Sequence, residues 1–381
     1  MSRPAAHTFI AALYRTGETH EFRFEHGRLA SSRQVRKQTT AVFGPGFVDM
    51  QCNGYAGVDF NRRETEPIVI AGAIKAMWEH GCTTVLPTFI TASEDGLNEF
   101  FTDMIKALAC DAEATRSVPC FHLEGPFISP EDGARGAHPK AHVKAVNVKL
   151  WSRLQKMAGG RIGLVTLAPE VRGALPFITQ LRQEKVLPAL GHTLADAACI
   201  ARAADAGAMM STHLGNGCPQ TMARHANPIF AQLGEDRLLA SFIADGVHLP
   251  PEVLRALWRS KGGGVLVTDA MAAAGAPPGL YSIGELAVKV GADRVVRAPG
   301  SDHLAGSALT MNEAVANLVR MARIPLADAW DAASLIPWAL LRQSGAVRGD
   351  LNSTVLGDWQ NGELKMLAAL RGEKLLWDCH I

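Results

Sequence analysis

The middle of the chain alternates between short apolar runs and longer segments with helical periodicity. Apolar runs of strand length occur at residues 45–50, 82–88, 118–123, 161–167, 186–190, 208–212, 238–243 and 264–268. Helix-like stretches lie between most of them or follow the last one, at 66–80, 94–109, 147–158, 174–184, 195–206, 225–233, 250–261, 311–322 and 326–342. Eight β/α steps favour an α/β fold with a closed (β/α)8 TIM-like barrel over an open doubly wound sheet.

Both ends of the chain have a different pattern. Residues 20–27 alternate polar and apolar positions and end on a glycine, which is typical of a half-buried strand. Near the C-terminus, the segments 353–358 and 364–367 flank Asn361-Gly362, a strong hairpin signal. We therefore predict a small β-sandwich domain formed from residues 1–44 and 344–381, and a catalytic barrel domain over 45–343. The Gly-, Ala- and Pro-rich stretch 270–306 is predicted to be a loop at the barrel mouth.

Composition narrows the choice of partners and compartment. The 381 residues are 48% hydrophobic with a net charge of +1, and no long basic or acidic block is present, so neither nucleic acid nor a membrane is an expected partner. The seven cysteines are scattered without a CxxC pair, which indicates reduced thiols. No apolar run approaches ~18 residues, and the N-terminus is a poor signal peptide, so a soluble, cytoplasmic protein is expected.

Polar residues with metal-binding chemistry stand where predicted strands end. Glu124 follows the third apolar run, His192 the fifth and His213 the sixth. The C-terminal ends of barrel strands meet at one mouth, and two imidazoles with one carboxylate are typical of catalytic zinc. We predict that these three residues bind one divalent metal, zinc first, although iron, cobalt or manganese also suit the set. The alternative is that each of the three residues has a separate structural role. Their joint placement at strand ends disfavours this alternative.

Asp269 ends the eighth apolar run. A carboxylate directly after a buried strand is costly unless it is paired. Beside a metal-activated water, it could take a proton from that water and later give it to a leaving group. The alternative is that Asp269 caps a following helix. The sequence contains no GxGxxG fingerprint and no phosphate-binding GxxxxGK[ST] loop, so hydride transfer and ATP chemistry have no support.

An ordered set of short strings resembles the N-acetylglucosamine-6-phosphate deacetylase family of the amidohydrolase superfamily. The match runs from about residue 44 to residue 340, and the β-rich ends agree with that family's small domain. The strings are Pro45-Gly46-Phe47-Val48-Asp49-Met50-Gln51-Cys52-Asn53-Gly54, His122-Leu123-Glu124-Gly125-Pro126, Leu190-Gly191-His192-Thr193, Thr212-His213-Leu214, Ala244-Asp245-Gly246-Val247-His248, Val267-Thr268-Asp269-Ala270 and Leu304-Ala305-Gly306-Ser307.

The resemblance implies an activity and a role for each matching residue. The reaction is hydrolysis of the N-acetyl group of N-acetylglucosamine 6-phosphate to glucosamine 6-phosphate and acetate, in amino-sugar metabolism. Glu124, His192 and His213 would be the metal ligands, and Asp269 the general base and acid. His138 resembles the family histidine that contacts the acetamide carbonyl, where an imidazole N–H would help to hold an oxyanion. The alternative is a solvent-exposed loop histidine.

The first predicted strand ends differently from that of many amidohydrolases. Those proteins carry His-x-His there and bind a second metal, whereas this chain has Gln51-Cys52-Asn53. Amides are poor zinc ligands, so Gln51 and Asn53 mark a vestigial second-metal position and one metal per subunit is expected. The alternative is that both side chains only form hydrogen bonds within the barrel floor.

Sugar-phosphate recognition is assigned by the resemblance to Asn216, Gly217, Arg224 and His248. Backbone N–H groups of a glycine-rich loop can approach an anion closely, and a guanidinium suits bidentate phosphate binding. In the family the arginine can reach over from a neighbouring subunit, which implies a homodimer. The sequence departs from the common family pattern between residues 215 and 223. A surface salt bridge is the alternative role for Arg224.

Three other functions fit the same barrel. A deacetylase for a related sugar, such as N-acetylgalactosamine 6-phosphate, would use the same residues, and so would a cyclic-amide hydrolase. A non-catalytic scaffold is the third possibility. It predicts that metal ligands have been lost, and the retention of the three ligand candidates and of Asp269 disfavours it.

Overall fold

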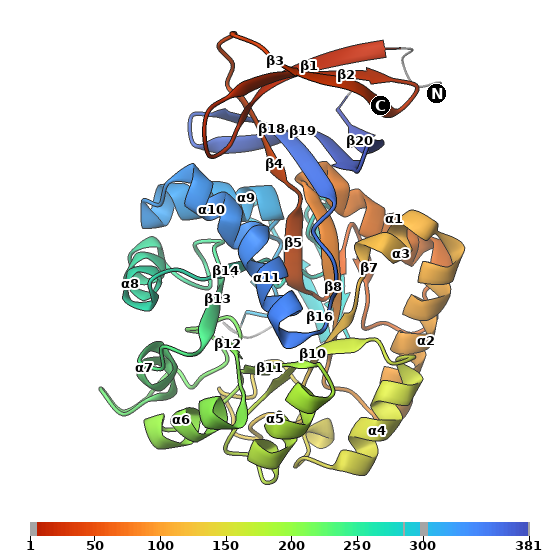
Figure 1. The fold of residues 1–381 in the computed structure, drawn as a ribbon. Helices are drawn as coiled ribbons and strands as arrows, with labels where there is room; N and C mark the ends of the chain where they lie inside the picture. The colour runs from red at the N-terminus through yellow and green to blue at the C-terminus, as the bar shows by residue number, and fades with distance from the viewer. Residues whose placement is uncertain (1–5, 285, 298–303, 380–381) are drawn as a thin grey trace.

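The computed structural model describes residues 6–284, 286–297 and 304–379, and Figure 1 shows a small β domain above a barrel ringed by helices. Eight parallel strands form the barrel sheet, in the order β14-β13-β12-β11-β10-β9-β8-β5. They are β5 (Phe47–Cys52), β8 (Cys82–Ile90), β9 (Phe121–Glu124), β10 (Ile162–Leu167), β11 (Leu187–Leu190), β12 (Met210–Ser211), β13 (Leu239–Ile243) and β14 (Val265–Val267). Each of them overlaps one predicted apolar run, so the (β/α)8 TIM-like barrel is confirmed.

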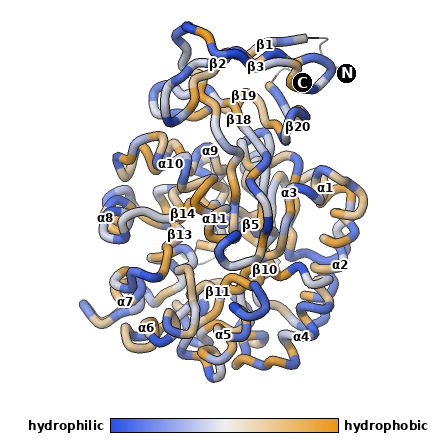
Figure 2. Tube along the Cα trace, viewed as in Figure 1, coloured by the Kyte–Doolittle hydropathy of each residue, from blue (hydrophilic) through white to orange (hydrophobic). Residues whose placement is uncertain are grey.

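The barrel strands are buried on both faces. Every residue of β8 and of β10 is buried, because side chains fill the barrel interior while helices cover its outside. Figure 2 shows hydrophobic positions along these strands and mixed positions along the surrounding helices. At the seam, Asp269 donates its backbone N–H to Gln51 O at 2.9 Å, which brings the ends of β14 and β5 together.

The helices cover the barrel with amphipathic faces. In α2, Ser93 caps the N-terminus by accepting a hydrogen bond from Gly96 N, and Leu97, Phe101 and Met104 lie on the buried face. The helices are α1 (Pro67–Ala76), α2 (Glu94–Cys110), α3 (Ala112–Ser117), α4 (Val148–Met157), α5 (Ala174–Gln183), α6 (Ala197–Ala206), α7 (Pro228–Leu233), α8 (Pro251–Lys261), α9 (Met311–Asn317), α10 (Leu326–Ala333) and α11 (Leu335–Ser344). Among the residues that the structure describes, none of these helices is long and apolar enough to cross a bilayer.

Strands from both termini build the small β domain, as predicted. Seven strands join in one closed sheet, in the order β1-β2-β3-β20-β19-β18-β4. Phe9, Phe24 and Leu356 belong to its separate apolar core. The strands are β1 (Ala6–Leu13), β2 (Thr19–Glu25), β3 (Arg28–Gln34), β4 (Ala41–Pro45), β18 (Ser353–Gln360), β19 (Glu363–Arg371) and β20 (Lys374–Asp378).

The stretch 270–306 is not the irregular loop that its composition predicted. It contains a three-stranded antiparallel sheet, β15 (Gly279–Ile283), β16 (Leu286–Val290) and β17 (Val296–Arg297). Val288 and Val290 are buried while Lys289 between them is exposed, so strict alternation makes β16 a strand despite the Gly- and Pro-rich flanks. Two short strands, β6 (Gly54–Tyr55) and β7 (Val58–Asp59), pair beside it, and residues 298–303 of the predicted loop lie outside the described residues.

Candidate active site

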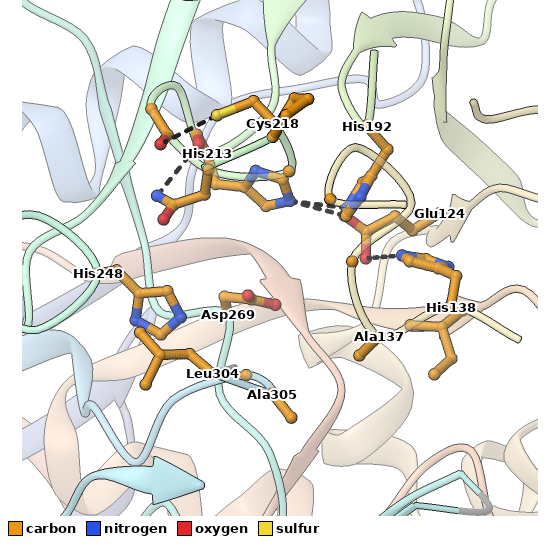
Figure 3. A pocket seen from close by; sticks show the side chains of 18 of the residues that line it. Glu124, Ala137, His138, His192, His213, Cys218, His248, Asp269, Leu304 and Ala305 are labelled. Carbon is orange, nitrogen blue, oxygen red and sulfur yellow. Dashed lines mark hydrogen bonds and ion pairs between the residues drawn. The ribbon is translucent and has the colours of Figure 1, made fainter. Parts of the chain in front are cut away.

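Three predicted metal ligands converge at the barrel mouth. Glu124 is the last residue of β9, and His192 and His213 each come two residues after a strand, β11 and β12 (Figure 3). The Nε2 atoms of His192 and His213 lie 3.3 and 3.0 Å from Glu124 Oε1. The two Nε2 atoms are 3.2 Å apart, and all three residues are buried. Segments up to 89 residues apart in the sequence therefore present three donor atoms to one point.

This donor set fits a divalent cation. Ligands at ~2.0–2.1 Å from a tetrahedral ion lie about 3.3 Å from one another, close to the observed 3.0 to 3.3 Å. His192 Nδ1 lies 2.9 Å from Ala134 O and donates to it, which leaves the lone pair on Nε2. Burial raises the pKa of Glu124, but its contacts with the His192 and His213 rings outweigh that effect and hold the pKa well below its usual range.

Three of the predicted site residues have left-handed backbone conformations. The φ angles are +51° at His192, +31° at His213 and +48° at Asp269. Such conformations cost about 1–3 kcal/mol each in non-glycine residues and cluster at functional sites. In each case the backbone turns sharply just after a barrel strand, so the strained turns accompany the three side chains that reach the barrel mouth.

Asp269 lies two residues after β14 and is held by two amides. Its Oδ1 accepts hydrogen bonds from Asn53 Nδ2 at 2.7 Å and from Gln51 Nε2 at 3.2 Å. Burial, followed by the charge of Glu124, raises the pKa of Asp269 to about 6, whereas a bound cation would act in the opposite direction. A turn rather than a helix follows Asp269, so the aspartate is not a helix cap in this fold.

Gln51 and Asn53 act as hydrogen-bond donors at the end of β5. Gln51 Nε2 also donates to Glu124 Oε1 at 2.9 Å, so this side chain links the two carboxylates. The amide oxygens, Gln51 Oε1 and Asn53 Oδ1, are buried without a hydrogen-bond partner among the described residues. The arrangement is the one expected if these amides form hydrogen bonds in the barrel floor.

His138 is buried beside the triad rather than exposed on its loop. Its Nε2 lies 3.8 Å from Glu124 Oε2, and its Nδ1 accepts a hydrogen bond from Thr91 N at 3.3 Å. Burial, followed by the charge of His192, lowers the pKa of His138 to about 3, so the ring is neutral and Nε2 carries the proton. The sequence analysis did not identify Thr91. The available signal was a threonine directly after the buried apolar run that forms β8.

Three of the four predicted phosphate residues fall into two groups that line the cavity. Asn216 and Gly217 lie on the loop after His213, and His248 lies across the pocket with its Nδ1 2.6 Å from Asp245 Oδ2. Gly217 has a φ of +59°, and an added Cβ would be 3.0 Å from His192 Nδ1, so this close approach needs glycine.

Arg224 belongs to neither group. It is exposed, and it lines none of the cavities identified among the described residues. Within one subunit the structure does not bring it to the other candidates.

The convergent residues line one cavity of about 470 Å³, a size typical of small-molecule sites. Its apolar walls come from several segments, including Ile90 of β8, Ile283 of β15 and the segment Leu304-Ala305. Lining residues that the sequence did not single out for the site include Ile90, Ala137, Gln220, Met222, Ile229 and Ile283.

A (β/α)8 barrel with two histidines, a glutamate and a buried aspartate at its mouth defines the class of barrel hydrolases with a metal-type site. The amidohydrolase family profile matches residues 43–344, and the chain belongs to that family. A Bacillus subtilis (strain 168) protein named N-acetylglucosamine-6-phosphate deacetylase is 32% identical over 286 residues, which span 74% of this chain and 71% of the relative. The resemblance noted in the sequence is therefore confirmed.

Two further relatives cover nearly the whole chain. An Escherichia coli O157:H7 protein named N-acetylgalactosamine-6-phosphate deacetylase is 29% identical over 358 residues, 93% of this chain and 91% of the relative. A solved structure of N-acetyl-D-glucosamine-6-phosphate deacetylase from Mycobacterium smegmatis is an aspartate-to-alanine mutant in complex with N-acetyl-D-glucosamine-6-phosphate. It has a TM-score of 0.81 and 26% identity, and covers 97% of this chain and 99% of that chain. The likeness thus includes the small β domain.

Proposed function

We propose that this protein hydrolyses the N-acetyl group of N-acetylglucosamine 6-phosphate, releasing acetate and glucosamine 6-phosphate. One observation carries the proposal: Glu124, His192, His213 and Asp269 line a single cavity of about 470 Å³. The names of relatives at 32% identity and of the Mycobacterium smegmatis structure point to the same substrate. A non-catalytic scaffold would not need these four groups at one point.

One divalent cation per subunit would be held by Glu124, His192 and His213. Zinc is the first choice for this set, with iron, cobalt or manganese as alternatives. When bound, the cation supplies Lewis-acid chemistry, polarising the amide carbonyl and acidifying water. Gln51 and Asn53 donate their N–H groups to carboxylates, and amide oxygens are poor zinc ligands, so we expect one cation rather than two.

Asp269 moves the proton. Two N–H donors engage Oδ1, and no partner of Oδ2 is found among the described residues, so Oδ2 is the atom that takes a proton from the attacking water. The same atom then gives this proton to the amide nitrogen, which leaves as a neutral amine. Burial raises the pKa of this carboxyl above its ordinary value, which favours its holding the proton between the two transfers.

His138 stabilises the developing negative charge on the substrate. Thr91 N–H occupies Nδ1 of the neutral ring, so Nε2–H points its dipole at the site beside Glu124. A fixed donor at this position strengthens its interaction as the carbonyl oxygen becomes an oxyanion. Thr91 is thus a positioning residue for His138.

The phosphate would bind through Asn216 and Gly217 on the loop after His213 and through His248, which all line the cavity. Arg224 would complete this site from a neighbouring subunit, which fits its exposed position, so the active form is a homodimer. We place the enzyme in the cytoplasm, where a phosphorylated sugar would be available.

Acetate release by the purified protein tests the proposal. Metal content is measured first, and then turnover of N-acetylglucosamine 6-phosphate and of its galactosamine epimer, which the Escherichia coli relative's name makes the main alternative. Asp269→Asn should keep the metal and lose ~10²–10⁴ in turnover. Metal-loaded protein that releases acetate from neither sugar, or an Asp269→Asn variant with wild-type activity, would contradict the proposal.

A further inference from the structure

A second cavity lies directly behind one wall of the candidate active site. It measures about 520 Å³ and shares Ile90, Ala137 and Ile283 with the active-site cavity. Beyond these shared residues it is lined by the exposed charged side chains of Arg62, Arg63 and Glu64 at its outer end, and by others that include Ser93 and Phe100. The reaction proposed above does not use this space.

Two buried isoleucines form the wall that the two cavities share. Ile90 ends β8 and Ile283 ends β15, and both are buried in one small apolar cluster beneath the hairpin. The hairpin tip rests on Ile90, because a Cβ added at Gly284 would lie 3.6 Å from Ile90 Cδ1. Two aliphatic side chains from segments almost 200 residues apart therefore separate the cavities.

A buried carboxylate fixes the hairpin tip in place. Asp59 Oδ2 accepts hydrogen bonds from Gly284 N at 2.8 Å and from Ser282 Oγ at 3.2 Å. Its Oδ1 accepts from Asn61 N at 2.8 Å. These bonds tie β15 to β7 through the residues on either side of Ile283.

The shared wall lies on the Ala137 side of the active-site cavity. Figure 3 shows His248 on one side of Asp269, and His138 with Ala137 on the other, beside Glu124. When the sugar phosphate lies toward His248, the acyl group of an amide held at Glu124 and His138 extends toward Ala137. That is the side on which Ile90 and Ile283 close the active-site cavity.

We propose that Ile90 and Ile283 determine acyl-chain length, and that the cavity behind them is a latent subsite for longer linear N-acyl groups. This inference rests on the proposed function. The reaction stays the same: water adds its oxygen to the acyl carbon, the C–N bond breaks, and the nitrogen takes the proton. Smaller side chains at these two positions would admit the N-propanoyl and N-butanoyl derivatives of the same hexosamine phosphate.

Truncation of the wall tests the inference. In Ile90→Ala and Ile283→Ala, kcat/KM for the N-butanoyl substrate relative to the N-acetyl substrate should rise about tenfold or more, since one methylene in an apolar pocket changes specificity by ~10–200-fold. Val288→Ala is the matched control, because Val288 is buried in the same cluster and is absent from the described lining of both cavities. Its ratio should stay within about twofold of the wild-type ratio.

The outcomes separate the two proposals. Wild-type protein that releases no acetate from either hexosamine phosphate overturns the proposed function, and this inference with it. Wild-type protein that releases acetate, combined with an unchanged ratio in both wall variants or an equal rise in Val288→Ala, overturns the inference alone. Equal turnover of the N-acetyl and N-butanoyl substrates by the wild-type protein also overturns the inference alone. If an alanine variant fails to fold, Ile90→Val should still raise the N-propanoyl ratio, and no rise there also overturns the inference.

Discussion

Asn53 donates a hydrogen bond of 2.7 Å from Nδ2 to Oδ1 of Asp269. This contact favours the charged carboxylate and so opposes burial, which raises the pKa of Asp269. It therefore sets the pH below which the proposed general base is protonated and inactive. The Asn53 amide thus lowers the pKa of the neighbouring carboxylate.

Asn53→Ala should move the acidic limb of the pH profile upward. Without the donor, the pKa of Asp269 rises further, and the ionised base is lost at a higher pH as the solution is acidified. A hydrogen bond to a charged group contributes about 1.5–3 kcal/mol, so the limb should shift by about one to two pH units. The measurement is kcat/KM between pH 4.5 and 9, with activity on the alkaline plateau as the internal control. Superimposable acidic limbs would show that Asn53 does not act on Asp269.

His192→Ala should reduce bound metal. The ring supplies one of three donors within 3.3 Å of one another, and its Nδ1 bond to Ala134 O holds the ring in place. Metal stoichiometry after dialysis should fall well below that of the wild type, and turnover with it. His225→Ala is the matched control, since His225 is an exposed histidine outside the described cavity linings. Full occupancy in His192→Ala would remove this residue from the ligand set.

Much of the site could be predicted because its residues follow buried strands. Glu124, His192, His213 and Asp269 each end an apolar run, and the parallel barrel brings such ends to one mouth. Local sequence is enough for this prediction. The length of each apolar run and the polar residue after it can be read from a few neighbouring residues, and the runs are then counted along the chain. The small β domain was predictable for a similar reason, from alternation and the Asn361-Gly362 turn.

The parts that sequence reasoning missed depend on contacts between distant segments. Thr91 orients His138 from 47 residues away, and nothing near either residue encodes that pairing. The wall between the cavities needs the β15–β16 hairpin, whose composition resembles a loop and whose strands are defined by packing on Ile90 and by the Asp59 hydrogen bonds. Arg224 shows the same limit, because its expected role needs a surface from another subunit.

Arg224→Ala should raise KM for the phosphorylated sugar much more than for the unphosphorylated analogue. A guanidinium that binds phosphate from a neighbouring subunit contributes charge-assisted hydrogen bonds, so a rise of about tenfold or more is expected. Steady-state kinetics on both sugars gives the comparison, and Arg348→Ala serves as a control at another exposed arginine. Equal effects on the two sugars would show that Arg224 does not bind the phosphate.

Asp49 should make the protein less stable as the pH rises. This fully buried carboxyl lies in β5, where it accepts hydrogen bonds from Thr268 Oγ1 and from Gln51 N. Burial raises its pKa from 3.8 to about 7, so the folded state binds the proton more tightly than the unfolded state does. By linkage, the stabilisation is fully present below about pH 4 and is lost as the pH rises toward 7.

Urea unfolding at pH 5 and pH 8 measures this dependence. The wild type should lose up to a few kcal/mol between these values, at ~1.4 kcal/mol for each unit of pKa difference. Asp49→Asn retains an acceptor for Gln51 N but cannot ionise, so its free energy of unfolding should change less over the same interval. Other titrating groups contribute equally to both proteins, and the difference between the two slopes therefore isolates Asp49. Parallel slopes for the wild type and Asp49→Asn would mean that this carboxyl is already ionised in the folded protein at pH 5.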